Sequence, residues 1–371
     1  MRTPAFFVAG ALLLGLAAAP AQAAASPALV APGAPFRVPA THTPAFETKP
    51  WGAQVKYPAE RYTVTCSQGP TGTVLGQRVM LTASHCVNQL PGLPPPSADI
   101  TVPVGETYSR IGTRGPNSGP TTQGVSPANL PTALTEADWA VVRIDDTVTA
   151  TNLTHSRDAA GRSQGNPVKL TGIRDFRTLR PGEFSIDNFG QPICKDGATT
   201  GRSCGRQIAR GRDSVYSVGV QATMGDSGGV NFDPRDGAVI GTTNGGVGPL
   251  FVSQAADRTI EDAFGIPDGQ VNDAFQLPET APRADFTPSG VEHERIAAAT
   301  RELNPDYVAP DPEAELRRAV DDAGNAAREV AHRAVRGEVG AEEVGGLVDK
   351  HANDIGLWVN LVMQDKYGIG G

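Results

Sequence analysis

Three short motifs supply a serine, a histidine and an aspartate, a set that can perform nucleophilic catalysis. Ser227 lies in Gly-Asp-Ser-Gly-Gly (225–229), His85 lies in Leu-Thr-Ala-Ser-His-Cys (81–86), and Asp138 directly precedes an apolar run. A serine hydroxyl is a poor nucleophile at neutral pH unless an imidazole takes its proton and a carboxylate orients that imidazole. We therefore expect Ser227 to attack a carbonyl carbon, His85 to act as general base and then general acid, and Asp138 to hold the imidazole.

Each of these residues also has a purely structural interpretation. The glycines on both sides of Ser227 favour catalysis, because they permit close substrate approach and backbone angles that a side chain would forbid. A lone aspartate before an apolar strand is commonly a strand-start residue, and Asp145 and Asp146 are alternative carboxylates. Both follow the apolar run, whereas Asp138 precedes it, so we prefer Asp138.

The N-terminal sequence and the charge balance indicate an exported protein. Within the first 25 residues, Arg2 is followed by an apolar run from Phe6 to Ala19 and by Ala21-Gln22-Ala23, which fits a signal-peptide cleavage site. A membrane anchor would need about 20 apolar residues, and both this run and Ile355–Met363 are shorter. The net charge of −8 argues against nucleic acid or an anionic membrane surface as the main partner. We expect a secreted protein without an integral membrane span.

The chain has four cysteines, which in an exported protein suggest two disulfide bonds. Cys194 and Cys204 are close in sequence, and hairpin-like sequence separates Cys66 from Cys86. Of the possible pairings, we therefore expect Cys66 with Cys86 and Cys194 with Cys204, each contributing about 2–4 kcal/mol. No His-Glu-x-x-His motif is present, so we expect neither a metal ion nor a cofactor.

The middle of the chain is predicted to form β-sheets. Glycine (43 residues) and proline (31 residues) are abundant and aromatic residues are sparse, a balance that favours a turn-rich β protein. Asp236-Gly237 lies at the turn of a predicted hairpin. Strands without alternating helices indicate a sandwich or barrels. The β-prone runs include Tyr62–Thr65, Arg78–Leu81, Trp139–Ile144, Pro167–Ile173, Val215–Val220 and Ala238–Thr243.

The C-terminal part of the chain is predicted to be helical. A short helix is expected over Asp257–Phe264, followed by a polar, proline-containing stretch over about 276–312. Asp311 can then cap a helix that has Pro312 in its first turn, and a second helix is expected over about 341–363. Two roles remain open for these helices: packing on the β domain, or binding a partner or blocking the site.

The motifs resemble those of the chymotrypsin-like serine protease family, particularly its secreted bacterial members of the alpha-lytic protease and streptogrisin type. The segments 81–86 and 225–229 and the loop from Cys194 to Gly205 carry the resemblance, and His, Asp and Ser follow in that family's order. It implies an all-β fold of two six-stranded antiparallel β-barrels with the site at their junction, beside a C-terminal α-helical appendage. It also implies a secreted bacterial serine endopeptidase that cleaves protein or peptide substrates through an acyl-enzyme; we expect a monomer.

These inferences divide the chain into four parts. They are a signal peptide (1–25), a Pro/Ala-rich linker or short propeptide (26–51), a chymotrypsin-like protease domain (52–275), and a linker with a helical extension (276–371).

The resemblance also implies roles for residues around the nucleophile. The backbone N–H groups of Gly225 and Ser227 would form an oxyanion hole. Asp226 would need a cation to hold the turn, and Lys195 stands where bacterial relatives have an arginine. We expect a Lys195–Asp226 ion pair and therefore an active site shaped without zymogen cleavage.

The expected substrate pocket contains no acidic residue, which argues against a preference for arginine or lysine before the cleaved bond. We expect an apolar residue there instead. Thr223 replaces the family's usual cysteine, and Asn244 replaces the usual serine of the segment that pairs with the substrate backbone. The expected lining residues are Gln221, Ala222, Thr223, Met224, Asn244, Gly245 and Gly246.

Two other function classes fit part of the pattern. Residues 225–229 also match the Gly-x-Ser-x-Gly pattern of serine esterases of another fold, and His293, His332 and His351 follow Ser227 as that class requires. The sequence after Ser227 indicates a strand and a turn, whereas such esterases continue into a helix. A non-catalytic binding protein on a protease fold is the other alternative, and the complete set of three residues argues against it.

Overall fold

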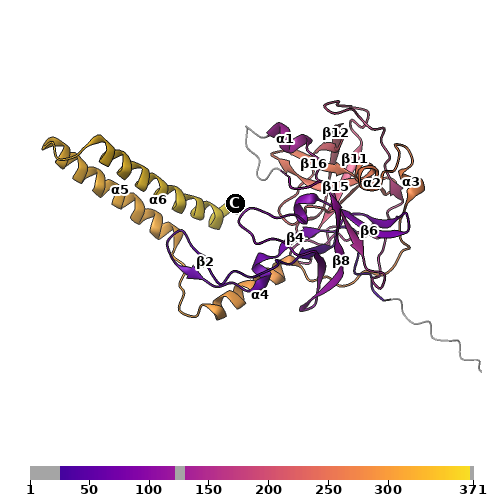
Figure 1. Cartoon of the computed structure of the whole chain (residues 1–371), viewed down its shortest axis with the longest axis horizontal. Coiled ribbons are helices and arrows are strands. Elements are labelled where there is room, and N and C mark those ends of the chain that lie inside the picture. Colours follow the sequence, from indigo (N-terminus) through magenta and orange to yellow (C-terminus); the bar gives the residue numbers. More distant parts are fainter. Residues whose placement is uncertain (1–25, 122–129, 368–371) are drawn as a thin grey trace, which may run out of the picture.

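A computed structural model describes residues 26–121 and 130–367 of the chain. Two β-sheets form the body of the molecule, and a pair of long helices extends away from it (Figure 1). The predicted signal peptide lies outside the described residues. Among the helices that the structure describes, none is both long and apolar enough to cross a membrane.

The first sheet has eight strands in the order β17-β5-β6-β9-β8-β7-β1-β4, and all neighbours are antiparallel. Its inner face buries an apolar core that includes Phe36, Met80 and Ile100. The strands are β1 (Pro35–Val38), β4 (Val64–Ser67), β5 (Thr71–Val74), β6 (Gln77–Thr82), β7 (Asp99–Val104), β8 (Thr107–Asn117), β9 (Ala140–Ile144) and β17 (Phe275–Gln276).

The second sheet closes on itself. β15 pairs with both β14 and β16, so β15, β14, β11, β12, β13 and β16 form a ring, and β10 adds to β15 in parallel. Ile193, Ile240 and Phe251 pack in its core. The strands are β10 (Gly172–Ile173), β11 (Pro192–Gly197), β12 (Gly201–Arg210), β13 (Ser214–Val218), β14 (Val230–Phe232), β15 (Ala238–Val247) and β16 (Leu250–Ala255).

The chymotrypsin-like all-β fold class with a helical appendage is confirmed. The expected six strands form the closed second barrel, whereas eight strands pair in the first sheet, where β17 adds to β5 after the chain has left the second sheet. The expected strand over Pro167–Ile173 is reduced to β10, because only Gly172 and Ile173 pair with β15. A separate hairpin contains β2 (Glu47–Thr48) and β3 (Gln54–Val55).

Part of the segment 26–51, which was expected to be a linker or short propeptide, forms a strand of the first sheet. β1 lies inside the first sheet, where Phe36 pairs with Cys66 and Arg37 pairs with Thr101. Ala28, Val30 and Phe36 are fully buried, because alternating apolar residues of a central strand face the core. Removal of this segment would take a strand out of the first sheet, between β4 and β7.

The polar, proline-containing stretch over about 276–312 contains a helix, α4 (Ser289–Leu303), that was not expected. Its sequence is rich in charged residues and its apolar stripe is weak, so periodicity did not indicate it. The expected helix at 257–264 is present as α2 (Ala256–Phe264). The remaining short helices are η1 (Ala59–Tyr62), η2 (Ser84–Cys86), α1 (Leu130–Thr135) and α3 (Val271–Ala274).

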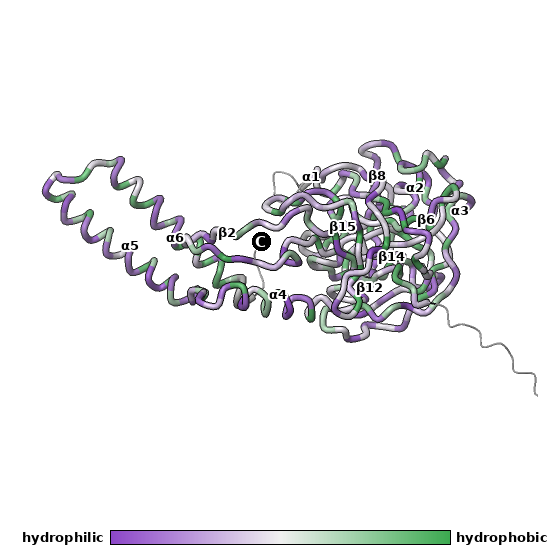
Figure 2. Tube along the Cα trace, turned by 60° about the horizontal axis from the view of Figure 1, so that its bottom comes forward, coloured by the Kyte–Doolittle hydropathy of each residue, from purple (hydrophilic) through white to green (hydrophobic). Residues whose placement is uncertain are grey.

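The two long helices, α5 (Pro312–Val335) and α6 (Ala341–Tyr367), form an antiparallel hairpin. Asp311 caps α5 as expected, since its carboxylate accepts hydrogen bonds from the N–H groups of Glu313 and Ala314. Hydrophilic and hydrophobic residues alternate along both helices (Figure 2). Trp358 of α6 stacks on Trp51, with ring centroids 5.5 Å apart, and this contact joins the hairpin to the β2–β3 turn.

Candidate active site

A hydrogen bond joins His85 to Asp138 at the junction of the two sheets. The short helix η2 carries His85, whose Nδ1 lies 2.7 Å from Asp138 Oδ2 and whose backbone N–H donates to Asp138 Oδ1 at 3.0 Å. Burial alone would lower the pKa of His85, but the charge of Asp138 and its hydrogen bond together raise it above the ordinary value of 6.5. The bond at Nδ1 leaves Nε2 as the atom that can take a proton.

The turn that carries Ser227 depends on its glycines. Gly225 and Gly228 have φ of +91° and +78°, a region that other residues rarely adopt. A Cβ on Gly225 would also lie 2.3 Å from Thr199 Oγ1. The turn is fixed against β4, because the Ser67 N–H donates to the Ser227 carbonyl at 2.8 Å and the Ser67 hydroxyl donates to the Gly225 carbonyl at 2.7 Å.

Two backbone donors in this turn have no acceptor. The N–H groups of Asp226, Gly228 and Gly229 are all bonded to carbonyls. Those of Gly225 and Ser227 donate to no atom among the described residues. Free N–H groups on both sides of a nucleophile form an arrangement that can bind an oxyanion.

Ser227 and His85 line the same cavity. No hydrogen bond joins these two residues in the described part of the chain. Of the three expected residues, Asp138 and His85 are joined by a hydrogen bond, and His85 and Ser227 share this cavity. In structures without substrate, catalytic hydrogen bonds are often long and shorten when the substrate binds.

Beneath the turn, Asp226 is fully buried and has five polar contacts. Its Oδ1 accepts the N–H groups of Thr199 and Thr200, and its Oδ2 accepts the Thr223 N–H and the Thr200 hydroxyl. Lys195 Nζ lies 3.0 Å from Oδ2, and both side chains are 0% exposed. Burial lowers the pKa of Lys195, although the charge of Asp226 opposes this effect. The expected Lys195–Asp226 ion pair is therefore formed and buried, and the Thr200 hydroxyl donates a further hydrogen bond to Asp226.

The structure forms both expected disulfides. Cys66 bonds Cys86 and Cys194 bonds Cys204. The first ties β4 to the η2 turn that carries His85, and the second joins β11 to β12 beside Lys195.

Most of the residues expected to form the substrate pocket lie outside the cavity that contains Ser227. Met224 lines this cavity and is 84% exposed. Gln221, Ala222 and Thr223 are exposed and lie elsewhere on the same loop. The segment Asn244–Gly246 pairs with β16 only, since the β14 ladder ends at Thr242 among the described residues.

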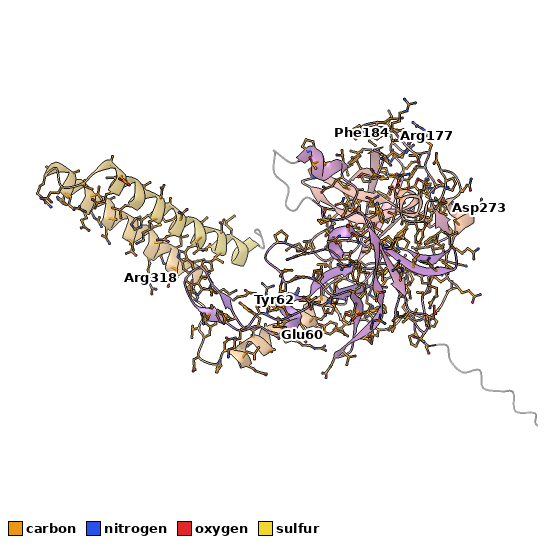
Figure 3. All side chains as sticks on the ribbon, viewed as in Figure 1. Glu60, Tyr62, Arg177, Phe184, Asp273 and Arg318 are labelled. Atoms are coloured by element: carbon orange, nitrogen blue, oxygen red, sulfur yellow. A yellow bond between two sulfur atoms is a disulfide. The ribbon has the colours of Figure 1, made fainter. Side chains whose placement is uncertain are left out.

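The cavity has a volume of about 970 Å³ and extends from Ser227 and His85 to helix α4. Thr63–Cys66 and Leu90 line one side, and His293 and Ile296 of α4 line another. Glu60 lies on η1 at this edge of the barrel, close to α4 (Figure 3). Helix α4 borders the cavity without filling it.

A buried ion pair holds α4 against the first sheet. Arg37 of β1 forms a double hydrogen bond with Glu292 of α4, with Nε 3.2 Å from Oε1 and a second bond from Nη2 to Oε2. The side chains are 3% and 6% exposed. The Tyr108 hydroxyl donates to Glu292 Oε1 at 2.9 Å, and burial together with the Glu292 charge raises the pKa of Tyr108.

The trypsin family matches residues 40–250, which is more than half of the chain. The chain belongs to the trypsin family. It is therefore a serine-type peptidase, a hydrolase whose substrates are peptides.

Several solved bacterial proteases are similar to this trypsin-family chain. Protease A of Thermobifida fusca is 20% identical, with 67% of this chain and 98% of that chain covered and a TM-score of 0.40. The Nocardiopsis protease is 24% identical, with 54% and 90% covered and a TM-score of 0.35. The chymotrypsin of Cellulomonas bogoriensis is 21% identical, with 58% and 91% covered and a TM-score of 0.36. These scores are too low to bear on function, and no curated protein matches the chain.

The sequence did not predict some of the residues that support this trypsin-family site. Gln254 accepts the Asp138 N–H at 2.8 Å, and Ser67 and Thr200 brace the turn that carries Ser227. Arg37 and Glu292 lie 255 positions apart. Only the proximity of Thr200 to Lys195 within the Cys194–Cys204 loop could have indicated its role.

Proposed function

We propose that the chain is a secreted serine endopeptidase in which Ser227 is the nucleophile, His85 the general base and acid, and Asp138 the group that orients His85. The hydrogen bond of 2.7 Å between Asp138 and His85, together with the cavity that His85 and Ser227 both line, is the observation that carries this proposal. An imidazole held at Nδ1 with a raised pKa is suited to accept the serine proton at Nε2.

The reaction proceeds through an acyl-enzyme. Ser227 Oγ attacks the carbonyl carbon of the scissile bond while His85 Nε2 takes its proton. The carbonyl oxygen becomes an oxyanion, which the free N–H groups of Gly225 and Ser227 bind; each such donor contributes about 3 kcal/mol to the transition state. His85 then protonates the leaving amine, and water hydrolyses the acyl-enzyme by the reverse sequence.

Lys195 supports this turn from below. Its buried pair with Asp226 needs no freed N-terminus, so the site is shaped without zymogen cleavage. The two disulfides support export. Because β1 is buried, we infer that processing removes the signal peptide and leaves residues 28–38 in the mature enzyme, which acts as a monomer.

Residues before the scissile bond would pair with the free edge of Asn244–Gly246 by strand addition. Met224 offers an apolar contact there, and no acidic side chain lies in this segment. We expect an apolar residue directly before the cleaved bond. Profiling with a peptide library checks this expectation, and a profile dominated by arginine or lysine would contradict it.

Residues after the scissile bond would enter the cavity beside α4. His85 protonates the leaving amine, so the leaving segment lies on the His85 side, where Leu90 and Ile296 line the cavity. The C-terminal extension thus contributes a wall of the substrate site through α4.

Labelling of the full chain with an organophosphonate serine probe tests the proposal. Labelling should occur, and both Ser227→Ala and His85→Ala should abolish it, whereas His332→Ala should label like the parent chain. Labelling that survives His85→Ala but is lost in His293→Ala would favour an esterase, because His293 is the downstream histidine that lines the cavity that contains Ser227. No labelling of the parent chain would favour a non-catalytic binding protein.

A further inference from the structure

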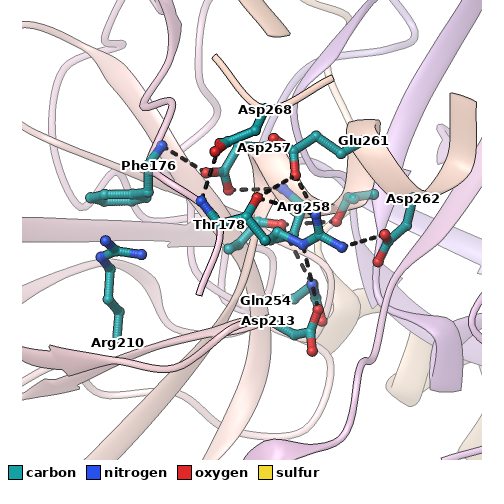
Figure 4. Close-up of polar contacts among 12 residues, drawn as sticks. Phe176, Thr178, Arg210, Asp213, Gln254, Asp257, Arg258, Glu261, Asp262 and Asp268 are labelled. Atoms are coloured by element: carbon teal, nitrogen blue, oxygen red, sulfur yellow. Dashed lines mark hydrogen bonds and ion pairs between the residues drawn. The ribbon is translucent and has the colours of Figure 1, made fainter. Parts of the chain in front are cut away.

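A cluster of carboxylates lies outside the catalytic cavity, around helix α2 of the second barrel. Figure 4 shows Asp257, Glu261 and Asp262 of α2 with Arg258 among them, and Asp268 beside Thr178. None of these residues lines the cavity that contains Ser227. The proposed catalytic steps make no use of this cluster.

Three of its members converge from different parts of the chain. Asp175 follows β10, Glu261 lies in α2, and Asp268 lies in the turn between α2 and α3. One carboxylate oxygen from each lies within 4.8 Å of the others. Calcium binds oxygens at about 2.3–2.6 Å, so oxygens at this separation can share one calcium ion.

Two buried oxygens in the cluster have no hydrogen-bond donor among the described residues. Asp175 Oδ1 and Glu261 Oε1 are both buried and unpartnered in the described part of the chain. Glu261 is only 5% exposed. A buried carboxylate oxygen without a donor is strongly unfavourable, so these two atoms indicate a missing cation.

The other oxygens of these side chains are already held in place. Asp175 Oδ2 accepts the Val271 N–H at 3.2 Å, and Asp268 Oδ1 accepts the Thr178 N–H at 3.1 Å. Glu261 Oε2 accepts bonds from Arg258 and Thr178. Each carboxylate is therefore oriented by one oxygen, while the unpartnered oxygens of Asp175 and Glu261 remain available as ligands.

The local charge does not balance. Arg258 contacts Glu261 and Asp262, and its Nε lies 3.7 Å from Asp213. The guanidinium of nearby Arg210 is paired with Asp187. One arginine thus serves three carboxylates, and neither Asp175 nor Asp268 forms an ion pair among the described residues.

We propose that Asp175, Glu261 and Asp268 bind a calcium ion. The donors are all oxygens, which suits calcium and not zinc. Three side chains, two of them from irregular segments, leave positions for water, as calcium tolerates and the stricter octahedron of magnesium does not. The ion would join the Asp175 loop to α2 and to the start of α3, and so stabilise the second barrel.

The test uses the full-length chain with Ser227→Ala, which removes self-digestion, after treatment with a chelator. Calorimetry with calcium chloride should show one site per chain with a dissociation constant of about 0.1–1 mM. At 10 mM calcium, Tm should rise by about 3–10 °C. Magnesium at the same concentration should give a smaller rise.

Glu261→Gln and Asp268→Asn should each weaken calcium binding at least about tenfold. Asp262→Asn is the matched control, because it lies on the same helix, contacts Arg258 and is not a proposed ligand. If Glu261→Gln fails to fold, calcium binding by Asp268→Asn, a change at an exposed position, provides the test instead. Absence of calcium binding by the parent chain, or unchanged binding in Asp268→Asn, would overturn the proposal.

Discussion

Helix α4 and the hairpin α5–α6 are consecutive in sequence but differ in their surroundings. α4 is fixed to the first sheet through the buried Arg37–Glu292 pair and lines the cavity that contains Ser227. The hairpin projects into solvent, and Arg318 marks its exposed surface (Figure 3). Among its described residues, only Ala319 and Trp358 are buried, each 9% exposed. Position in the chain therefore does not decide which part of the extension serves the site.

Two buried ion pairs extend this comparison to the turn that carries Ser227. Lys195–Asp226 lies beneath this turn, and in the proposed mechanism it supports the oxyanion donors, which every substrate would use. Arg37–Glu292 joins the extension to the first sheet, and in the same mechanism it supports only the leaving side of the cavity. Changes at the first pair should affect all substrates equally, and changes at the second should depend on the substrate residues after the scissile bond.

The largest effect is expected for Asp138→Asn. Loss of the carboxylate leaves the wrong tautomer of His85 and should lower kcat about 10⁴-fold, equally for small esters and long peptides.

The pH dependence of the parent enzyme gives a separate prediction. His85 must be neutral to accept a proton, and its pKa is raised above 6.5. We therefore expect kcat/KM to rise with pH through a value above 6.5. Rate measurements from acidic to alkaline pH check this. A profile without an inflection between pH 6 and 9 would contradict the role of His85.

The next effect is expected for Lys195→Met. The change leaves the Asp226 carboxylate buried without its cation, so the turn relaxes and the oxyanion donors move. We expect kcat/KM to fall about 10²–10³-fold on every substrate. Lys169→Met, at an exposed position, is the control. Unchanged turnover in Lys195→Met would refute the pairing.

A smaller and selective effect is expected for Glu292→Gln. Arg37 is then left buried without a counter-charge, which destabilises the docked α4 by about 3–5 kcal/mol. Thermal unfolding should show a lower Tm, and kcat/KM should fall about tenfold for peptides that extend beyond the scissile bond. A small ester without a leaving peptide should be hydrolysed at the parent rate.

The double variant Arg37→Met with Glu292→Leu sharpens this test. An apolar pair of similar volume can replace a buried ion pair without loss of stability. Stability and the selectivity for long peptides should both return. An equal loss on the ester and on the peptides in Glu292→Gln would show that α4 does not act as a separate wall.

The sequence predicted both disulfides, because each closes a short segment, and the family resemblance implied the Lys195–Asp226 contact. It did not predict β1 or α4. An alanine- and proline-rich segment gives little strand signal, and β1 is stable only because β4 and β7 pair with it. The packing of α4 on the first sheet depends on the contact between Glu292 and Arg37, which are 255 positions apart. A local sequence pattern cannot predict such a contact.

Within α4 itself, Ile296→Asp should alter selectivity by a few-fold. Ile296 lines the cavity on the leaving side, so a carboxylate there should disfavour peptides with an apolar residue after the scissile bond relative to those with a basic residue. Internally quenched peptides that differ only at that position provide the measurement. Glu294→Ala, on an exposed face of the same helix, should leave the ratio unchanged.

The smallest effect is expected on removal of the hairpin. A chain that ends at residue 308 keeps α4 and the bond from Asn304 to the Lys56 carbonyl, but it loses the stack of Trp358 on Trp51. That contact contributes about 0.5–1.5 kcal/mol, so Tm should fall by only about 1–6 °C. Activity on esters and on long peptides should stay within about twofold, because no described residue of the hairpin lines the cavity that contains Ser227. A selective loss on long peptides would show instead that the hairpin, like α4, belongs to the substrate site.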